Sequence, residues 1–424
     1  MSREPFIAEP ADLAYDGPTE APPMTKPLTD AAAALRVALS GATRGLVERE
    51  ALAELIALAA VAGEHVLVIG PPGTAKSEAV RRIARAVDAR LFEYLLGRFT
   101  EPSEIFGPID LRRLKEGFVE TETSGMLPEA ELAFLDEVFK GSTAILNTLL
   151  GILNERVFRR GHTLVRCPLR VCVGASNALP EDDSLAAFSD RFLVRVFVDP
   201  VPDPRLEELL EAGWGLDHGE APDFQPASLA DLDTLTAAAR QSDLARVRPH
   251  LAHAIRLLRG AGIVLSDRRA VRVQGLVAAA AALAGRARAT DADLWPLVLA
   301  VPTREQQALA RECLGEVLAR TENATLPAAA EEASLGPLAR AARIAAAGRD
   351  ALREQPGDDE ELEDWLLRLE GIAREIDAGF APETLPPELV EVRRRIVEAL
   401  RGGPTTAEFS DIGEHPELKA VRSS

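Results

Sequence analysis

Three groups of residues in this chain could together carry out phosphoryl-transfer chemistry. The first is a turn rich in glycine and proline, and it consists of Gly70, Pro71, Pro72, Gly73, Thr74, Ala75, Lys76 and Ser77. It follows an apolar run at 65–69 and leads into a helical pattern that starts at Glu78. A strand that turns directly into a helix aims several backbone N–H groups at one point, where the helix dipole also favours negative charge. The turn therefore predicts a phosphate-binding loop.

The last two residues of this turn supply the remaining chemistry. Lys76 offers a cation for the β and γ oxygens of a nucleotide, and Ser77 offers a hydroxyl that can ligate Mg²⁺. Ala75 stands where a glycine usually precedes the lysine, and we expect the loop to keep its shape if the φ there stays negative. The alternative is an ordinary strand-turn-helix corner, which the Lys-Ser pair between a strand and a helix disfavours.

The second group is a pair of carboxylates, Asp136 and Glu137, at the end of the apolar run 132–138. A buried strand tolerates charge only at its end or beside a partner. We expect Asp136 to lie near a Mg²⁺ ion or its water, and Glu137 to polarise the water that attacks a γ-phosphate. Acidic residues end many strands, but a pair downstream of a phosphate-binding loop is a stronger signal.

The third group consists of polar residues that end later segments. Asn177 closes the apolar strand 169–177 and could hydrogen-bond both the attacking water and the γ-phosphate, although Asn is also a common turn residue. Arg191 precedes another apolar strand, at the edge of the expected domain. It is poorly placed for its own nucleotide and well placed for that of a neighbouring copy. A salt bridge to the adjacent Asp190 is the alternative.

Two further pairs could contact a nucleotide. Arg268 and Arg269 follow Ser266, a helix N-cap, and the dipole disfavours cations at that end of a helix. A bound phosphate would resolve this conflict. Leu46 and Val47 lie between two helical patterns ahead of the loop and could pack beside the nucleotide base. Plain core packing is an equally good explanation for these two residues.

The composition argues against nucleic-acid-binding, disulfide-rich and membrane-spanning proteins. The chain has 424 residues, is 47% hydrophobic and carries a net charge of −19, which argues against a broad nucleic-acid footprint. The three cysteines show no metal-ligand spacing and no disulfide framework, which fits a reducing compartment. No stretch approaches the length of an apolar membrane span, and the start lacks the apolar region of a signal peptide. We therefore expect a cytoplasmic protein.

Taken together, the motifs resemble the MoxR branch of the AAA+ ATPases, with the RavA subgroup as the closest likeness. The resemblance covers about residues 29–320, and it rests on the segments 70–77, 134–138, 144–150, 154–156, 175–177 and 190–192. It implies an α/β P-loop NTPase core with a parallel sheet, followed by an all-helical lid. On this basis we expect a disordered leader at 1–28, the AAA+ core at 29–201, the lid at 202–325 and a helical C-terminal extension at 326–424.

The resemblance also implies roles for the residues named above. Lys76 and Ser77 would be Walker A, Asp136 and Glu137 Walker B, Asn177 sensor 1, Arg191 the arginine finger, and Arg268 the sensor 2 arginine, with Arg269 as the alternative for the last. The cofactors would be ATP and Mg²⁺, bound between the subunits of a homo-oligomer that is expected to be a hexamer. Relatives remodel a client protein and commonly work with a von Willebrand factor A domain partner.

The resulting hypothesis is an ATP-hydrolysing, chaperone-like remodelling ATPase. An ATP-gated assembly scaffold with slow or incidental hydrolysis is the alternative, and the presence of Glu137 favours the enzyme. A nucleic-acid motor is disfavoured by the net charge and would reveal itself through salt-dependent binding.

Overall fold

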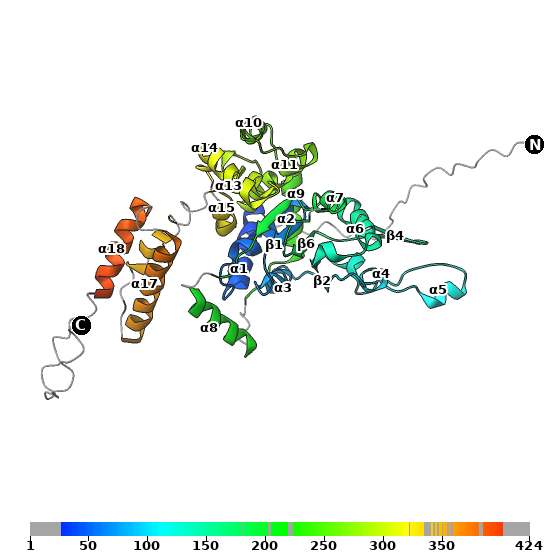
Figure 1. Cartoon of the computed structure of the whole chain (residues 1–424), viewed down its shortest axis with the longest axis horizontal. Coiled ribbons are helices and arrows are strands. Elements are labelled where there is room, and N and C mark those ends of the chain that lie inside the picture. The colour runs from blue at the N-terminus through cyan, green and yellow to red at the C-terminus, as the bar shows by residue number, and fades with distance from the viewer. Residues whose placement is uncertain are drawn as a thin grey trace, which may run out of the picture.

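A five-stranded parallel sheet lies at the centre of the molecule, with the strand order β2-β3-β6-β1-β7 (Figure 1). The strands are β1 (Val66–Ile69), β2 (Leu91–Leu95), β3 (Leu132–Asp136), β6 (Val171–Ser176) and β7 (Val194–Phe197). Val66 pairs with Val173 of β6 and Val194 of β7, so these strands begin at the same edge of the sheet. The predicted α/β fold with a parallel sheet is confirmed.

The computed structural model describes residues 27–401 except for 181, 202–204, 219–223, 322, 335–340, 342–343, 346, 350, 354–355, 357–358 and 381–384. The predicted disordered leader, 1–28, therefore lies outside the described residues apart from its last two. Leu28 begins the first helix of the structure.

Helices cover both faces of the sheet. Alternate residues of a strand point to opposite faces, so Val66 and Val68 of β1 enter one core and Leu67 and Ile69 enter another. The first core includes residues of α1 (Leu28–Thr43), α2 (Glu50–Ala62) and α3 (Lys76–Ala86). The second includes one face of α6 (Thr143–Glu155), whose N-terminus is capped by Ser142. Coverage on both faces explains the continuous burial of β1.

A projection extends from the body beyond the ends of β2 and β3 (Figure 1). Its elements are α4 (Pro102–Phe106), α5 (Leu111–Lys115), η1 (Leu127–Glu129) and the antiparallel pair β4 (Val157–Arg160) and β5 (Thr163–Arg166). Two further short segments are η2 (Val138–Lys140), which follows β3, and α7 (Asp183–Ser189), which follows β6. His162, in the β4–β5 turn, accepts a hydrogen bond from the N–H of Val119. Residues 97–131 are thus an insertion between β2 and β3 that contacts the β4–β5 turn.

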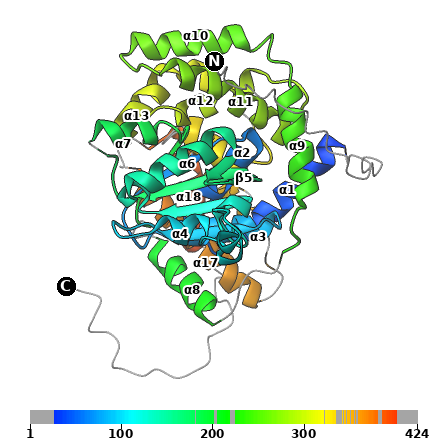
Figure 2. The same cartoon turned by 90° about the vertical axis from the view of Figure 1, so that its right-hand side faces the viewer.

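Most helices after β7 contribute residues to the same core as the sheet. They are α9 (Leu229–Gln241), α10 (Arg248–Gly260), α11 (Asp267–Leu283), α12 (Pro296–Leu299), α13 (Arg304–Cys313) and α14 (Gly315–Leu318), with the short η4 (Asp291–Asp293) before α12. Leu232 of α9 and Leu276 of α11 belong to one cluster with Leu55 of α2, so these helices of the proposed lid share a hydrophobic core with the helices that cover the sheet. The described residues of α8 (Leu206–Asp217) contribute nothing to this core, and Figure 2 shows that helix below the sheet.

The proposed C-terminal extension contains two different parts. The first is α15 (Pro327–Ser334), which packs against α2, and the second is formed by α17 (Asp359–Gly379) and α18 (Pro387–Arg401). These two long helices enclose a small core of their own that includes Leu369, Ile376, Leu389 and Ile396. They lie apart from the sheet in Figure 1. The half-buried Trp365 packs against this core.

A buried glutamate of α2 holds the N-terminus of α15. Glu54 is 7% exposed, and its Oε2 accepts a hydrogen bond of 2.7 Å from the N–H of Ala329. Burial raises the pKa of Glu54 from 4.5 to about 8. Between these values the folded chain binds a proton that the unfolded chain releases, so the free energy of unfolding should fall as pH rises.

We expect this residue to contribute a slope of at most about 1.4 kcal/mol per pH unit between pH 5 and 8. Denaturant unfolding of wild type and Glu54→Gln across this range measures the contribution as the difference between their slopes. The comparison with Glu54→Gln is needed because burial also raises the pKa of Glu64, to about 7, so Glu64 contributes to the slope of both proteins. Identical slopes would show that Glu54 does not titrate in this way.

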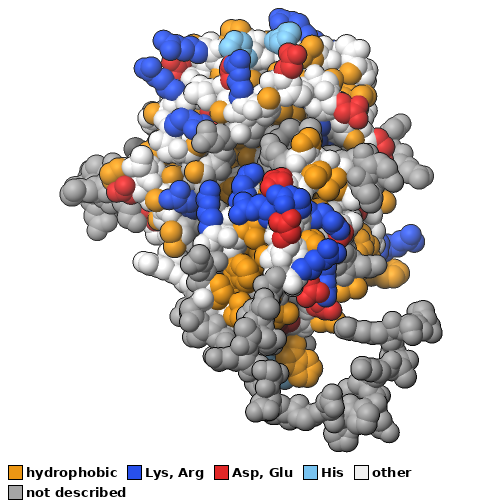
Figure 3. Space-filling model, turned by 90° about the vertical axis from the view of Figure 1, so that its left-hand side faces the viewer, with side chains coloured by type: hydrophobic (Ala, Val, Ile, Leu, Met, Phe, Trp, Pro, Cys, Tyr) orange, Lys and Arg blue, Asp and Glu red, His pale blue; other side chains and the backbone are white. Residues whose placement is uncertain are grey.

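Basic and acidic side chains lie together on the face of the molecule that Figure 3 shows. On the α17–α18 pair, Arg393 forms an ion pair of 2.6 Å with Asp377, and Arg394 forms one of 2.6 Å with Glu391. The arginines of α18 are thus partly neutralised, which is unlike the continuous basic stripe of a nucleic-acid-binding surface. Within the part of the chain that the structure describes, every helix is too short or too polar to cross a membrane.

Candidate functional site

The loop between β1 and α3 surrounds the ammonium group of Lys76. Its Nζ donates hydrogen bonds to the carbonyl oxygens of Gly70 (3.1 Å) and Pro71 (2.7 Å) and lies 3.3 Å from Oγ1 of Thr74. Burial lowers the pKa of Lys76, an effect that the charge of Asp136 opposes. Because α3 begins at Lys76, the unpaired N–H groups of its first turn also face the loop. The loop therefore presents a cation and amide donors to a single point.

Two glycines give this loop its path. A Cβ atom on Gly70 would lie only 2.3 Å from the carbonyl oxygen of Val198, at the end of β7. Gly73 has a φ of +77°, a left-handed backbone that glycine adopts at no steric cost. Both positions agree with a loop whose backbone must bend sharply to direct its N–H groups inward.

The expectation of a negative φ at Ala75 is wrong. Its φ is +55°, and it forms the left-handed N-cap of α3. The backbone has to reverse at this point so that the loop meets the helix with its N–H groups converging, which explains why glycine is usual there. An alanine in this conformation costs on the order of 1 kcal/mol, a strain that the surrounding loop must offset.

The predicted carboxylates meet the predicted asparagine at the end of the sheet. Since β3 and β6 are neighbours, Asp136–Glu137 and Asn177 emerge side by side. Asn177 Nδ2 donates a hydrogen bond of 3.1 Å to Oε1 of Glu137. The N–H of Glu137 donates to Oδ1 of Asp136 at 2.9 Å, and Glu137 has a left-handed φ of +51°. Asn177 thus orients the carboxylate of Glu137 and is more than a turn residue.

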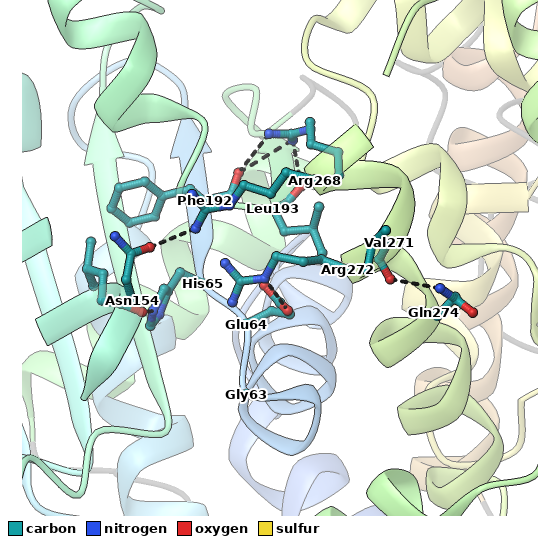
Figure 4. A network of polar contacts seen from close by, with 12 residues as sticks. Gly63, Glu64, His65, Asn154, Phe192, Leu193, Arg268, Val271, Arg272 and Gln274 are labelled. Atoms are coloured by element: carbon teal, nitrogen blue, oxygen red, sulfur yellow. Dashed lines mark hydrogen bonds and ion pairs between the residues drawn. The ribbon is translucent and has the colours of Figure 1, made fainter. Parts of the chain in front are cut away.

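Arg268 and Arg269 have different surroundings. The guanidinium of Arg269 is buried and donates to the carbonyl oxygens of Leu193 and Ala300, at 2.8 Å each, and to Asp190 at 3.0 Å. Arg268 instead donates to Oδ1 of Asn154 at 2.7 Å (Figure 4). Arg269 therefore fastens α11 to the start of β7, and Arg268 is the better candidate for contact with a nucleotide.

Among the described residues, Asp190 forms its ion pair with Arg269, and none is found between Asp190 and Arg191. The Nε atom of Arg191 is buried and has no hydrogen-bond partner among the described residues. Arg191 also lies just before β7, at the edge where strands start, whereas the phosphate-binding loop follows the end of β1. The length of a four-residue strand, roughly 10 Å or more, separates these two edges.

Arg268 lies at this same starting edge of the sheet. The adjacent Arg269 binds the carbonyl of Leu193, one residue before β7. The structure therefore brings together Lys76, Asp136, Glu137 and Asn177, but it does not bring Arg191 or Arg268 to them within one chain.

Known proteins share these features. Residues 33–237 match the family model for the MoxR domain in MoxR-vWA-beta-propeller ternary systems. The chain contains a MoxR-family AAA+ ATPase domain. The chain is also similar to the chaperone MoxR1 of Mycobacterium tuberculosis, which is 28% identical over 175 residues that cover 40% of this chain and 46% of MoxR1.

Two longer matches are to uncharacterized proteins of Methanocaldococcus jannaschii. They are 37% and 38% identical to this chain over 253 and 251 residues. Both matches span 58% of this chain. They span 66% and 64% of the two relatives, so this chain covers just under two thirds of the length of each. The fold resembles the crystal structure of a candidate ATPase from Cytophaga hutchinsonii, with a TM-score of 0.55 at 15% identity, over 70% of this chain and 97% of that one.

One buried arginine that contacts the phosphate-binding loop was not identified from the sequence. Arg49 is 4% exposed; its Nε donates to the carbonyl oxygen of Thr74 at 2.8 Å and its Nη2 to that of Asp199 at 2.7 Å. The carboxylate of Asp199 in turn forms an ion pair of 2.9 Å with Arg304 of α13. Arg49 thus connects the phosphate-binding loop to the segment that leads into the later helices. The role of Arg49 could not be recognised from residue spacing, because its partners are distant in sequence.

Leu46 and Val47 lie just before Arg49 and are 3% and 4% exposed. Leu46 belongs to the core that covers the sheet, in agreement with the packing alternative. Contact of either residue with a nucleotide base stays a prediction.

Proposed function

We propose that this chain is an ATP-hydrolysing, chaperone-like remodelling ATPase that acts as a ring with nucleotide bound between subunits. The hydrogen bond of 3.1 Å between Asn177 Nδ2 and Glu137 Oε1 carries this proposal. It places an oriented carboxylate at the edge of the sheet where the loop around Lys76 also lies. A carboxylate held in this way is suited to act as a general base on water.

The loop fits ATP with Mg²⁺. The first-turn N–H groups of α3 and the ammonium of Lys76 would bind the phosphates. Ser77, the second residue of α3, and Asp136 would hold Mg²⁺, which neutralises the charge that develops on the phosphate oxygens. The proposed likeness to the RavA subgroup implies alanine before the lysine of this loop, which is the residue type at Ala75.

Four residues would contribute to the hydrolysis of ATP. Water attacks the γ-phosphorus, its proton passes to the carboxylate of Glu137, and the bond to the bridging oxygen breaks to give ADP and inorganic phosphate. Asn177 positions Glu137 for this transfer. Arg191 and Arg268 of a neighbouring subunit would stabilise the charge of the transition state, because each lies at the opposite edge of the sheet from its own loop.

The partners follow from the same proposal. A client protein would meet the projection, where Leu111, Phe118 and Leu164 are 69%, 45% and 67% exposed. A protein with a von Willebrand factor A domain would act alongside, since the matching family model describes MoxR domains of such systems. We propose a hexamer as the ring and the cytoplasm as its location.

Phosphate release from ATP by the purified protein tests this function. We expect release that requires Mg²⁺ and stops when EDTA removes the metal, because Ser77 and Asp136 would lose the ion they hold. Lys76→Ala should lose both ATP binding and turnover. ATP binding without phosphate release in the wild-type protein would instead support an ATP-gated scaffold.

A further inference from the structure

A lysine competes for the carboxylate of Glu137. Lys140 Nζ lies 3.2 Å from Oε1 of Glu137, three residues earlier in the chain. Asn177 donates to the same oxygen at 3.1 Å, so two donors meet on one atom. The side chain of Lys140 is 56% exposed, whereas that of Glu137 is 19% exposed. Lys140 is therefore free to leave the pair at little cost to the fold.

The pair borders a hollow of about 490 Å³ on the β2 side of β3. Its lining consists of the residues from the end of β2 and the loop after it, together with Glu104, Glu137 and Lys140. The phosphate-binding loop follows β1, which lies beyond β6 on the other side of β3. Lys140 thus lines, together with Glu137, a hollow whose other lining residues come from the side of β3 opposite to β6 and the loop.

We propose that Lys140 is a positioning residue that restrains Glu137 and thereby limits the rate of ATP hydrolysis. This inference rests on the proposed role of Glu137 as the general base. A general base has to present a carboxylate oxygen to the attacking water, and an oxygen that accepts from both Asn177 and Lys140 is less available to do so. The hollow gives the long lysine side chain space to move away when Glu137 acts.

Lys140→Met tests this restraint, because it removes the charge and keeps most of the side-chain volume. We expect kcat for ATP hydrolysis to rise by about two- to fivefold, the range that a partly exposed ion pair can supply. The affinity for ATP and the thermal unfolding midpoint should not change. Lys140→Arg should keep the wild-type rate because it retains the charge. Lys115→Met, at an exposed lysine of α5, is the matched control.

The double variant Glu137→Gln, Lys140→Met should be as inactive as Glu137→Gln, which would show that Lys140 acts through Glu137. An unchanged or lower kcat in Lys140→Met, with a normal rate for Lys115→Met, would overturn the restraint and leave the proposed function standing. Full activity of Glu137→Gln would overturn both, because Glu137 would then not be the general base.

Discussion

Replacing Glu137 by glutamine is expected to lower ATP turnover by about 10²- to 10⁴-fold and to leave ATP binding intact. The amide keeps the shape of the side chain but cannot take a proton from water. It can still contact Asn177, which lies 3.1 Å from Oε1. The neighbouring Lys76 and the loop around it stay unchanged, so the phosphates keep their binding partners. Phosphate release at saturating ATP, measured beside equilibrium ATP binding, separates these two effects.

Glu211→Gln is the control for this change, since Glu211 is an exposed residue of α8. It should hydrolyse ATP at the wild-type rate. A Glu137→Gln protein that turns over ATP normally would remove Glu137 from the reaction and make the adjacent Asp136 the next carboxylate to test.

Arg191→Ala is expected to lower the rate by about 10³-fold, the scale on which arginine fingers act. Arg191 lies at the edge of the sheet opposite its own loop, and its Nε has no hydrogen-bond partner among the described residues. Mixing Arg191→Ala with Lys76→Ala subunits should restore part of the activity. At mixed interfaces, the intact loop of one variant would meet the intact arginine of the other.

Arg240→Ala controls for loss of a surface arginine, because Arg240 is exposed on α9, and it should be fully active alone. If the mixture stays as inactive as its two components, Arg191 has a structural role within its own chain. In that case its loss should also lower the thermal unfolding midpoint, which can be measured on the same samples.

Local patterns predicted the elements that carry the site. The helical spacing from Thr143 to Glu155 and the capping serine before it, Ser142, are a local pattern that matches α6. The apolar runs of β1 and β3, each followed by charged or glycine-rich residues, define two strands that lie within one sheet. The contact between Glu137 and Asn177 follows from this arrangement, because parallel strands end at a common edge.

Contacts between distant segments were not predictable in the same way. Arg268 was predicted as the sensor 2 arginine with Arg269 as the alternative, and only the packing of α11 against the start of β7 shows that Arg269 is buried. Arg49 binds Thr74 and Asp199, partners that no local pattern connects to it. The φ of Ala75 was predicted with the wrong sign, because alanine's own preference was given more weight than the path the loop requires.

Lys140 is an intermediate case. It lies three residues after Glu137, a spacing at which side chains can meet within a short helical turn such as η2. The ion pair could have been foreseen from that spacing. The hollow beside it depends on the loop after β2 and could not have been foreseen.

The most direct test of the central claim is the ATPase rate per subunit as a function of protein concentration, with the mass of the particle measured in ATP and in ADP. Active sites completed by Arg191 of a neighbouring subunit predict a rate that rises steeply with concentration, together with an oligomer of about six chains that ATP favours. A constant rate from a monomer would contradict the claim, because each chain would then hydrolyse ATP without the arginine of another.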